Sequence, residues 1–403
     1  MDSQNKKKLL WFSICNNLII LGFFKYYNFF LDSFIQLSHQ FGFDASPHTL
    51  KIILPVGISF YTFQTMSYTI DIYREKMKPT ESLLDFSLFV SFFPQLVAGP
   101  IERASKLLPQ IEKLISPTRE HLIAGSILIF TGYIRKVLIS DNIAPIVDDY
   151  FKNYETLSSI YLLAGLILFS FQIYFDFSGY SSIARGLAKI LGIDLMINFN
   201  QPYFSQNISE FWNRWHISLS SWLRDYVYIP LGGNRSGETR TYINLMITMM
   251  VGGLWHGPSW NFVYWGALHG CYLVVYKMMF RPKENEQRRS LLFSVLCAVF
   301  IYCLVLITWL PFRAPDIKTT HHFLYNMVMW SGEIDINIIW LLSLLFSVLI
   351  LIDLPIYITK DHTCIRRLPI WFLGAVLFLG SIAVLITMVL NVNSVRPFIY
   401  FQF

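Results

Sequence analysis

Runs of about 20 apolar residues recur along the whole sequence, and this feature constrains the fold more than any other. They lie near residues 9–30, 50–70, 121–140, 157–176, 241–256, 260–280, 291–312, 334–355 and 370–390. Inside a bilayer no water satisfies backbone polar groups, so a spanning segment must be a helix or part of a closed barrel. Runs of this length suit helices, and the sequence therefore predicts an all-α, polytopic membrane protein with about nine to eleven transmembrane helices.

The composition supports this assignment. Hydrophobic residues make up 54% of the chain and charged residues 14%, whereas about a quarter of an average soluble chain is charged. Basic loop residues that face anionic lipid account for the net charge of +6, so it requires no nucleic-acid partner. The five cysteines show no paired spacing and no metal-ligand cluster stands out, so we expect neither a disulfide framework nor a bound metal.

Positively charged residues set the expected orientation, because cytoplasmic loops carry an excess of lysine and arginine. They concentrate at Lys6–Lys8, Arg74–Lys78, Arg103–Arg119, Arg185 and Lys189, Arg281–Arg289, and Lys360–Arg367. We expect these loops and the N-terminus in the cytoplasm, and the C-terminus outside with residues 31–49, 141–156 and 313–333. The basic start lacks a cleavage site behind a short apolar core, so we expect a retained first span. No repeat or linker divides the chain, which predicts one transmembrane domain over residues 1–403.

Two segments depart from the pattern of full spans. The run 83–100 ends in proline and glycine, which predicts a short or re-entrant element. In the segment 203–240, large apolar residues between Phe211 and Ile229 recur every three or four positions among charged ones. This spacing predicts an amphipathic helix in the cytoplasmic interface, with Ser209 as its N-cap.

Two ionisable rings lie inside apolar sequence. The stretch GGLWHGPSWNFVYWGALHG, residues 252–270, contains His256 and His269. An ionisable residue at membrane depth marks a functional site by default, whereas the alternative is a histidine hydrogen-bonded to a neighbouring helix. Glycines and Pro258 around His256 predict an interrupted helix there, and His269 is expected to be structural. By contrast, Lys25 in FFKYYNFF is interpreted as a lysine that snorkels from an interfacial aromatic girdle.

Five blocks of sequence together resemble one known family. These are FFPQLVAGPIER (92–103), YFDFSGYSSIARGL (174–187), FWNRWHISLSSWLRDYVYIPLGGNR (211–235), GGLWHGPSWNFVYWGALHG (252–270) and PFIYFQF (397–403). They resemble the membrane-bound O-acyltransferase (MBOAT) family. The order of the blocks and their residues are most similar to its bacterial branch of alginate O-acetylases (AlgI), peptidoglycan O-acetyltransferases and DltB-like D-alanyl transferases.

The resemblance implies transfer of an acyl group from a thioester to a hydroxyl, through a central tunnel that crosses the membrane. His256 matches the essential histidine of the family and His216 its second recurrent position. The chemistry agrees, because the attacking hydroxyl must lose a proton and imidazole is the side chain that titrates nearest neutrality. We therefore predict that His256 is the general base. The role of His216 stays open among polarising the carbonyl, orienting the acceptor and holding the donor.

Further residues are candidates for contacts with substrate or donor. Arg214, Arg224 and Arg235 suit the phosphates of a cytosolic carrier, because guanidinium groups match phosphate geometry; lipid headgroups are the alternative partner. Trp255 and Trp215 adjoin the two histidines. Asp176 is a charge at membrane depth that either pairs with a cation, orients a histidine or caps the following helix.

The resemblance implies acetyl-CoA or another acyl thioester as donor substrate, with no bound cofactor. It also implies a polysaccharide acceptor and an extracytoplasmic partner protein that completes the transfer. Three alternatives remain open. One is DltB-like D-alanyl transfer from a carrier protein to teichoic acid, and the second is a transporter with His256 and Asp176 as a proton relay. The third is a scaffold for polysaccharide export.

Overall fold

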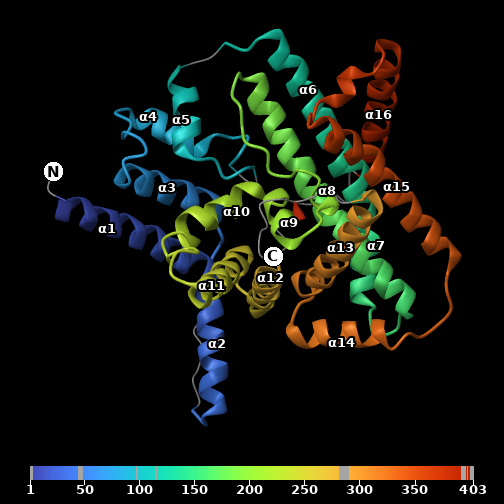
Figure 1. Cartoon of the computed structure of the whole chain (residues 1–403), viewed down its shortest axis with the longest axis horizontal. Coiled ribbons are helices and arrows are strands. Elements are labelled where there is room, and N and C mark those ends of the chain that lie inside the picture. Colours follow the sequence, from blue (N-terminus) through green and yellow to red (C-terminus); the bar gives the residue numbers. More distant parts are fainter. Residues whose placement is uncertain are drawn as a thin grey trace.

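The computed structural model describes residues 3–43, 49–96, 99–113, 116–280, 290–391, 396, 398 and 399. Within these residues all regular structure is helical, as the sequence predicts (Figure 1). The basic run predicted at residues 281–289 lies outside the described residues.

Sixteen α-helices follow one another in the described part of the chain. They are α1 (Ser3–Leu21), α2 (Tyr27–Gln40), α3 (Ile58–Tyr73), α4 (Leu83–Ser91), α5 (Ala104–Lys113), α6 (Arg119–Tyr133), α7 (Asp141–Lys152), α8 (Ser159–Ile190), α9 (Ile208–Arg214), α10 (Ile217–Leu223), α11 (Glu238–His256), α12 (Trp260–Met279), α13 (Leu291–Arg313), α14 (Ile317–Val328), α15 (Ile336–Thr359) and α16 (Ile370–Leu390). Short π-helical turns join several of them: η1 (Gly22–Tyr26), η2 (Ile134–Ser140) and η4 (Arg224–Tyr228). Two 3₁₀ turns are η3 (Pro202–Phe204) and η5 (Cys364–Arg367).

Six helical segments of the described chain are long and apolar enough to cross a membrane. They are Gln4–Gln40, Arg119–Lys152, Ser159–Ile190, Leu291–Arg313, Ile336–Thr359 and Ile370–Leu390. The protein is therefore a multi-pass membrane protein, while the count of nine to eleven spans stays a prediction. Three of the nine apolar runs in the sequence are not among these six segments, and they correspond to α3, α11 and α12. The 16 residues of α3 reach only about 24 Å, and α11 and α12 carry glycine, histidine and asparagine where a span is usually aliphatic. As predicted, the run that begins with α4 forms a short helix rather than a span.

The long helix α8 forms the centre of the molecule, and most of its residues are buried (Figure 1). It packs closely against α6 through two pairs of glycines. A Cβ on Gly125 would lie 2.7 Å from the carbonyl oxygen of Gly186, and a Cβ on Gly132 would lie 2.7 Å from that of Gly179. Small residues of this kind let two membrane helices bring their backbones together.

A second close pair, α11 and α12, carries the residues of most interest. A Cβ on Gly253 would lie 2.1 Å from the carbonyl oxygen of Phe262, and one on Gly266 would lie 2.3 Å from that of Met249. The two helices therefore touch along their backbones, and the turn between them begins directly after His256.

This contact gives a first prediction. Gly253→Ala should force α11 away from α12 and lower the melting temperature by several degrees, because overpacking costs about 1–3 kcal/mol. Thermal unfolding in detergent measures the effect. Gly374→Ala in α16 is the matched control, since its Cβ would meet nothing within 4 Å. Equal melting temperatures for the two variants would show that α11 and α12 do not need this contact.

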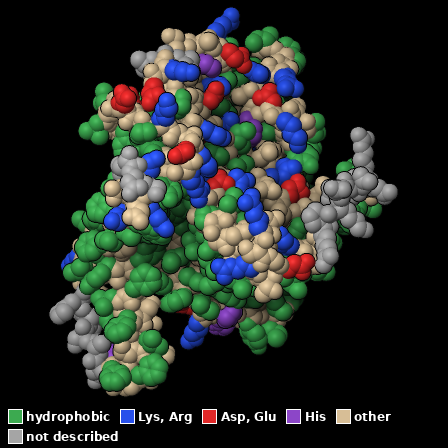
Figure 2. All heavy atoms as spheres, turned by 60° about the vertical axis from the view of Figure 1, so that its left-hand side comes forward, with side chains coloured by type: hydrophobic (Ala, Val, Ile, Leu, Met, Phe, Trp, Pro, Cys, Tyr) green, Lys and Arg blue, Asp and Glu red, His purple; other side chains and the backbone are tan. Residues whose placement is uncertain are grey.

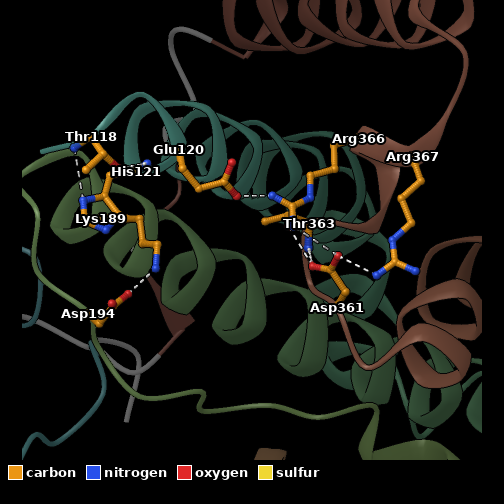
Figure 3. A network of polar contacts seen from close by, with 9 residues as sticks. All are labelled: Thr118, Glu120, His121, Lys189, Asp194, Asp361, Thr363, Arg366 and Arg367. Carbon is orange, nitrogen blue, oxygen red and sulfur yellow. Dashed lines mark hydrogen bonds and ion pairs between the residues drawn. The ribbon is translucent and has the colours of Figure 1, made fainter.

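Charged loops gather on one face of the molecule. Figure 3 shows Glu120 at the start of α6 facing Arg366, and Asp361 between Thr363 and Arg367. The pair Lys189 and Asp194 lies beside them. In the space-filling view, charged side chains concentrate in the upper half of the visible face, above a largely hydrophobic region (Figure 2). The ends of α2 and α14 lie on the opposite side of the molecule (Figure 1). The predicted cytoplasmic loops at residues 120, 189 and 361–367 thus share a face.

The loop before α5 places two charges inside this face. Glu102 and Arg103 are 2% and 9% exposed. The Glu102 carboxylate accepts a hydrogen bond from the backbone N–H of Met196, and Arg103 pairs with Asp225 at 3.6 Å. Burial raises the pKa of the Glu102 carboxyl to about 7, which Lys106, Arg103 and Arg185 partly oppose by their positive charge.

This shift predicts how stability depends on pH. An unfolded glutamate titrates near pH ~4.3, so between that pH and about 7 the native state holds more protons and stability falls as the pH rises. Glu102→Gln keeps an acceptor for Met196 but does not ionise. Its melting temperature should therefore fall less than that of the unaltered protein between pH 5 and pH 8. The exposed Glu112, changed to Gln, is the control and should follow the unaltered protein. A Glu102→Gln curve parallel to the unaltered one would contradict the assignment.

Candidate active site

The predicted amphipathic helix is broken at the position of greatest interest. The sequence predicts one helix from Ser209 onward, but the structure has α9, α10 and the π turn η4, with Asn207 as the N-cap of α9. The break falls at His216, whose backbone is left-handed with φ 43°. The prediction of a single continuous helix is therefore wrong, and its position in the cytoplasmic interface stays a prediction. Periodicity cannot reveal the break, because the polar contacts that cause it come from elsewhere in the chain.

Those contacts come from Asn198, which precedes the segment. The His216 ring nitrogen Nδ1 lies 3.1 Å from the Asn198 side-chain oxygen, and the N–H and hydroxyl of Ser218 donate to the same oxygen at 3.2 and 3.0 Å. The backbone N–H of Ile217 donates to the Asn198 carbonyl at 2.9 Å. Asn198 thus accepts the hydrogen bonds of the N–H and O–H groups that follow the left-handed turn, and it holds the His216 ring in place. His216 is fully buried.

His256 is the last residue of α11, and its ring faces that of His216. The two ring centroids are 6.4 Å apart, and Trp255 packs against both rings at 5.9 and 5.2 Å. Trp265 and Phe312 close the other side of the His256 ring at 5.0 and 5.2 Å. His256 is 5% exposed. The structure therefore brings the two histidines together, with Trp255, in an aromatic chamber.

The remaining aromatic candidates form the wall of this chamber. Trp215 is buried and lies 4.9 Å from Trp309 between ring centroids, in the layer behind His216. His269 is fully buried and its Nε2 lies 2.9 Å from the hydroxyl of Thr308, with Trp265 4.7 Å away between rings. His269 thus lies in the wall, hydrogen-bonded as its structural interpretation requires.

Asp176 lies next to the site, on the central helix α8. Its carboxylate pairs with Lys136 and accepts a hydrogen bond of 3.0 Å from the backbone N–H of Ile399. The next residue, Phe177, packs edge-on against His216 at 4.6 Å. Of the three roles considered for Asp176, the geometry matches pairing with a cation.

The three arginine candidates lie away from the chamber. Arg214 donates to Glu210 at 2.9 Å and to the Asn200 carbonyl at 3.0 Å. The Arg224 side chain is 61% exposed and pairs with Asp225, and Arg235 is exposed. The structure thus places Arg224 and Arg235 at the surface, where a soluble ligand can reach them.

Lys25 corrects a further interpretation. The sequence suggests a lysine that snorkels to the interface, but its ammonium points inward. It donates to the carbonyl oxygens of Trp255 at 2.6 Å and His256 at 3.2 Å, and to the Ser59 hydroxyl at 3.1 Å. The chain turns sharply between α1 and α2 (Figure 1), at the π turn η1 that contains Lys25. The hydrogen bonds to Trp255 and His256 show that the side chain points from this bend to the end of α11. No local sequence pattern encodes a contact across 230 residues.

A cavity of about 720 Å³ opens beside this contact. Lys25 and Pro258 line it together with Asp32, Trp260, Asp316 and Lys318. These residues belong to η1, α2, the turn before α12, and the starts of α12 and α14, on the side opposite the charged network of Figure 3. His256 is not among the lining residues, so the tunnel that the sequence predicts stays a prediction.

Comparison with known proteins agrees with the resemblance in the sequence. The family model of the membrane-bound O-acyltransferases matches residues 72–314. A probable alginate O-acetylase AlgI of Azotobacter vinelandii is 41% identical over 87% of this chain and 69% of its own length. A peptidoglycan O-acetyltransferase of Helicobacter pylori is 38% identical over 81% of this chain and 66% of its own length. A teichoic acid D-alanyltransferase of Bacillus subtilis is 32% identical over 61% of this chain and 63% of its own length.

Proposed function

We propose, on the premise that this chain belongs to the membrane-bound O-acyltransferase family, that it takes an acetyl group from cytosolic acetyl-CoA. The acetyl group is delivered across the membrane to hydroxyls of an extracytoplasmic polysaccharide. Relatives named as alginate and peptidoglycan O-acetylating enzymes support the acetyl group and this class of acceptor. The protein is a multi-pass membrane enzyme, and in this proposal its membrane is the cytoplasmic membrane, with the N-terminus inside and the C-terminus outside.

The observation that carries the proposal is the buried pair of His216 and His256, with ring centroids 6.4 Å apart. His256 removes the proton from an acceptor hydroxyl while its oxygen attacks the thioester carbonyl. The carbon–sulfur bond then breaks, and the proton passes from His256 to the leaving thiolate. His216, held by Asn198, lies on the other side of the reacting groups. Aromatic walls exclude water, which protects the thioester from hydrolysis.

The two faces of the molecule suit two different substrates. The cavity next to Lys25 and Pro258 opens away from the charged face, and we assign it to the acceptor or to the extracytoplasmic partner protein that completes the transfer. We assign the contacts with the acetyl donor, acetyl-CoA, to the charged face. There Arg224 is the favoured contact for the phosphates of acetyl-CoA, because its side chain is 61% exposed. Arg214 already donates to Glu210 and Asn200 and is the weaker choice.

The donor contact can be tested by charge reversal. Arg224→Glu should raise the KM for acetyl-CoA about fivefold to tenfold at low salt with little change in kcat, because a charge-assisted contact is lost and repulsion is added. Membrane vesicles supplied with labelled acetyl-CoA give both constants. The exposed Arg240, changed to Glu, is the control. If both variants share the unaltered KM, Arg224 faces lipid headgroups instead.

The proposed function is tested in cells. Polysaccharides purified from the envelope of a strain that lacks the gene are compared by mass spectrometry with those of strains complemented by the unaltered gene or by His256→Ala. We expect ester-linked acetyl groups only with the unaltered gene. An ester-linked D-alanyl group in their place would identify the reaction named for the Bacillus subtilis relative. Unchanged esters in all strains would reject acyl transfer and leave a transporter or a scaffold.

A further inference from the structure

The end of α11 needs partners from outside the helix. The last four carbonyl groups of any α-helix have no intrahelical donor. In α11 three of them, at Leu254, Trp255 and His256, point toward the bend between α1 and α2. The residue that follows, Gly257, is extended with φ −165° and does not fold back to cap the helix.

Two adjacent residues of the bend supply these partners. The Tyr26 hydroxyl donates to the Leu254 carbonyl at 2.8 Å, and the Lys25 ammonium donates to those of Trp255 and His256 at 2.6 and 3.2 Å. Tyr26 is 8% exposed, and the third donor position of Lys25 is satisfied by Ser59. A positive charge at the C-terminal end of a helix is also favoured by the helix dipole.

The local backbone is arranged for this contact. Lys25 and Tyr26 close the π-helical turn η1, where the first helix bends (Figure 1). A π turn inside an α-helix is rare and is frequently found at functional sites. Without η1, Lys25 would lie on the lipid-facing girdle that the sequence suggests. The bend therefore places a lysine and a tyrosine on the helix end that bears His256.

We propose that Lys25 and Tyr26 are positioning residues for the acyl transfer, because together they cap α11 and fix the His256 ring opposite His216. This inference rests on the proposed function. Neither side chain handles the transferred proton; they act through the backbone of α11. A base displaced by about 1 Å loses on the order of a hundredfold in rate, so a small movement of this helix end is sufficient to matter.

The cavity makes the idea testable by chemical rescue. Lys25 lines the cavity, so a small cation can reach the space left when the lysine side chain is removed. In Lys25→Ala, kcat should fall on the order of tenfold to a hundredfold while the KM for acetyl-CoA stays unchanged. Addition of propylammonium chloride should restore part of the lost kcat. Lys152→Ala is the matched control, because Lys152 is exposed at the end of α7 and is not among the residues that line the cavity. That variant should keep its rate with and without the amine.

Tyr26→Phe supplies a second variant that keeps the volume of the side chain. It removes only the hydrogen bond to Leu254 and should lower kcat severalfold without changing the KM. If Lys25→Ala does not fold, Tyr26→Phe decides alone. A kcat within twofold of the unaltered protein for both variants, or a loss in Lys25→Ala that propylammonium does not reverse, would overturn the proposal.

Hydrogen–deuterium exchange separates this inference from the function on which it rests. In nanodiscs, a peptide that covers the last turn of α11 should exchange faster in Lys25→Ala than in the unaltered protein, whether or not acetyl transfer is detected. Equal exchange would reject the capping role. If the unaltered protein transfers no acetyl group but Lys25→Ala still exchanges faster, only the proposed function is rejected and the capping role stands.

Discussion

Replacing His256 with alanine should lower acetyl transfer by on the order of a thousandfold, because the imidazole that removes the hydroxyl proton in the proposed reaction is lost. The ring lies at the end of α11, between Trp255, Trp265 and Phe312. The main-chain contacts that hold this helix end come from Lys25 and Tyr26 and do not involve the imidazole. Expression and detergent melting should therefore change little. Initial rates with labelled acetyl-CoA in membrane vesicles measure the loss.

A matched control for this substitution is available in the same molecule. His321 is exposed in α14, and its ring contacts Tyr264 at 3.4 Å without reaching the chamber. His321→Ala should keep full activity. Transfer by His256→Ala at the rate of His321→Ala would remove the assignment of the base.

The second large effect is expected at His216. Loss of its ring should lower the rate about a hundredfold, because the His216 imidazole lies in the chamber 6.4 Å from that of His256, between ring centroids. Alanine alone is a poor test, since it also strains the left-handed backbone of φ 43°. Asparagine tolerates this conformation, so His216→Asn separates the loss of the ring from the strain.

The two variants of His216 distinguish its possible roles. If the ring takes part in the reaction, His216→Asn and His216→Ala lose similar activity, and His216→Asn melts close to the unaltered protein. Activity retained in His216→Asn but lost in His216→Ala would instead show that the position serves only the turn held by Asn198.

The sequence predicts well those features that depend on local pattern. Apolar length identifies the all-helical membrane fold, and a histidine in the middle of apolar sequence identifies His256, while the resemblance to the family adds His216. The comparisons confirm the family, and the structure brings the two rings to 6.4 Å between centroids. Their chemical roles remain predictions.

The features that the sequence missed depend on contacts between distant residues. Asn198 fixes His216 from 18 residues away, and Lys25 reaches His256 across 231. The periodicity between Phe211 and Ile229 is real, but it cannot show that a left-handed residue interrupts the helix. Likewise, a lysine among aromatic residues resembles an interfacial lysine until the bend at η1 is known. Long-range polar contacts of this kind leave no periodic signal.

The central claim is that a thioester on the cytosolic face donates its acetyl group across the membrane with His256 as the base. Vesicles with a defined orientation test this claim most directly. Inside-out vesicles from the complemented cells receive labelled acetyl-CoA on the outside, followed by an esterase that cannot cross the membrane. With the unaltered protein we predict labelled ester that resists the esterase until detergent opens the vesicles, and with His256→Ala none. Protected ester formed equally by His256→Ala, or ester that the external esterase removes completely, would contradict the account.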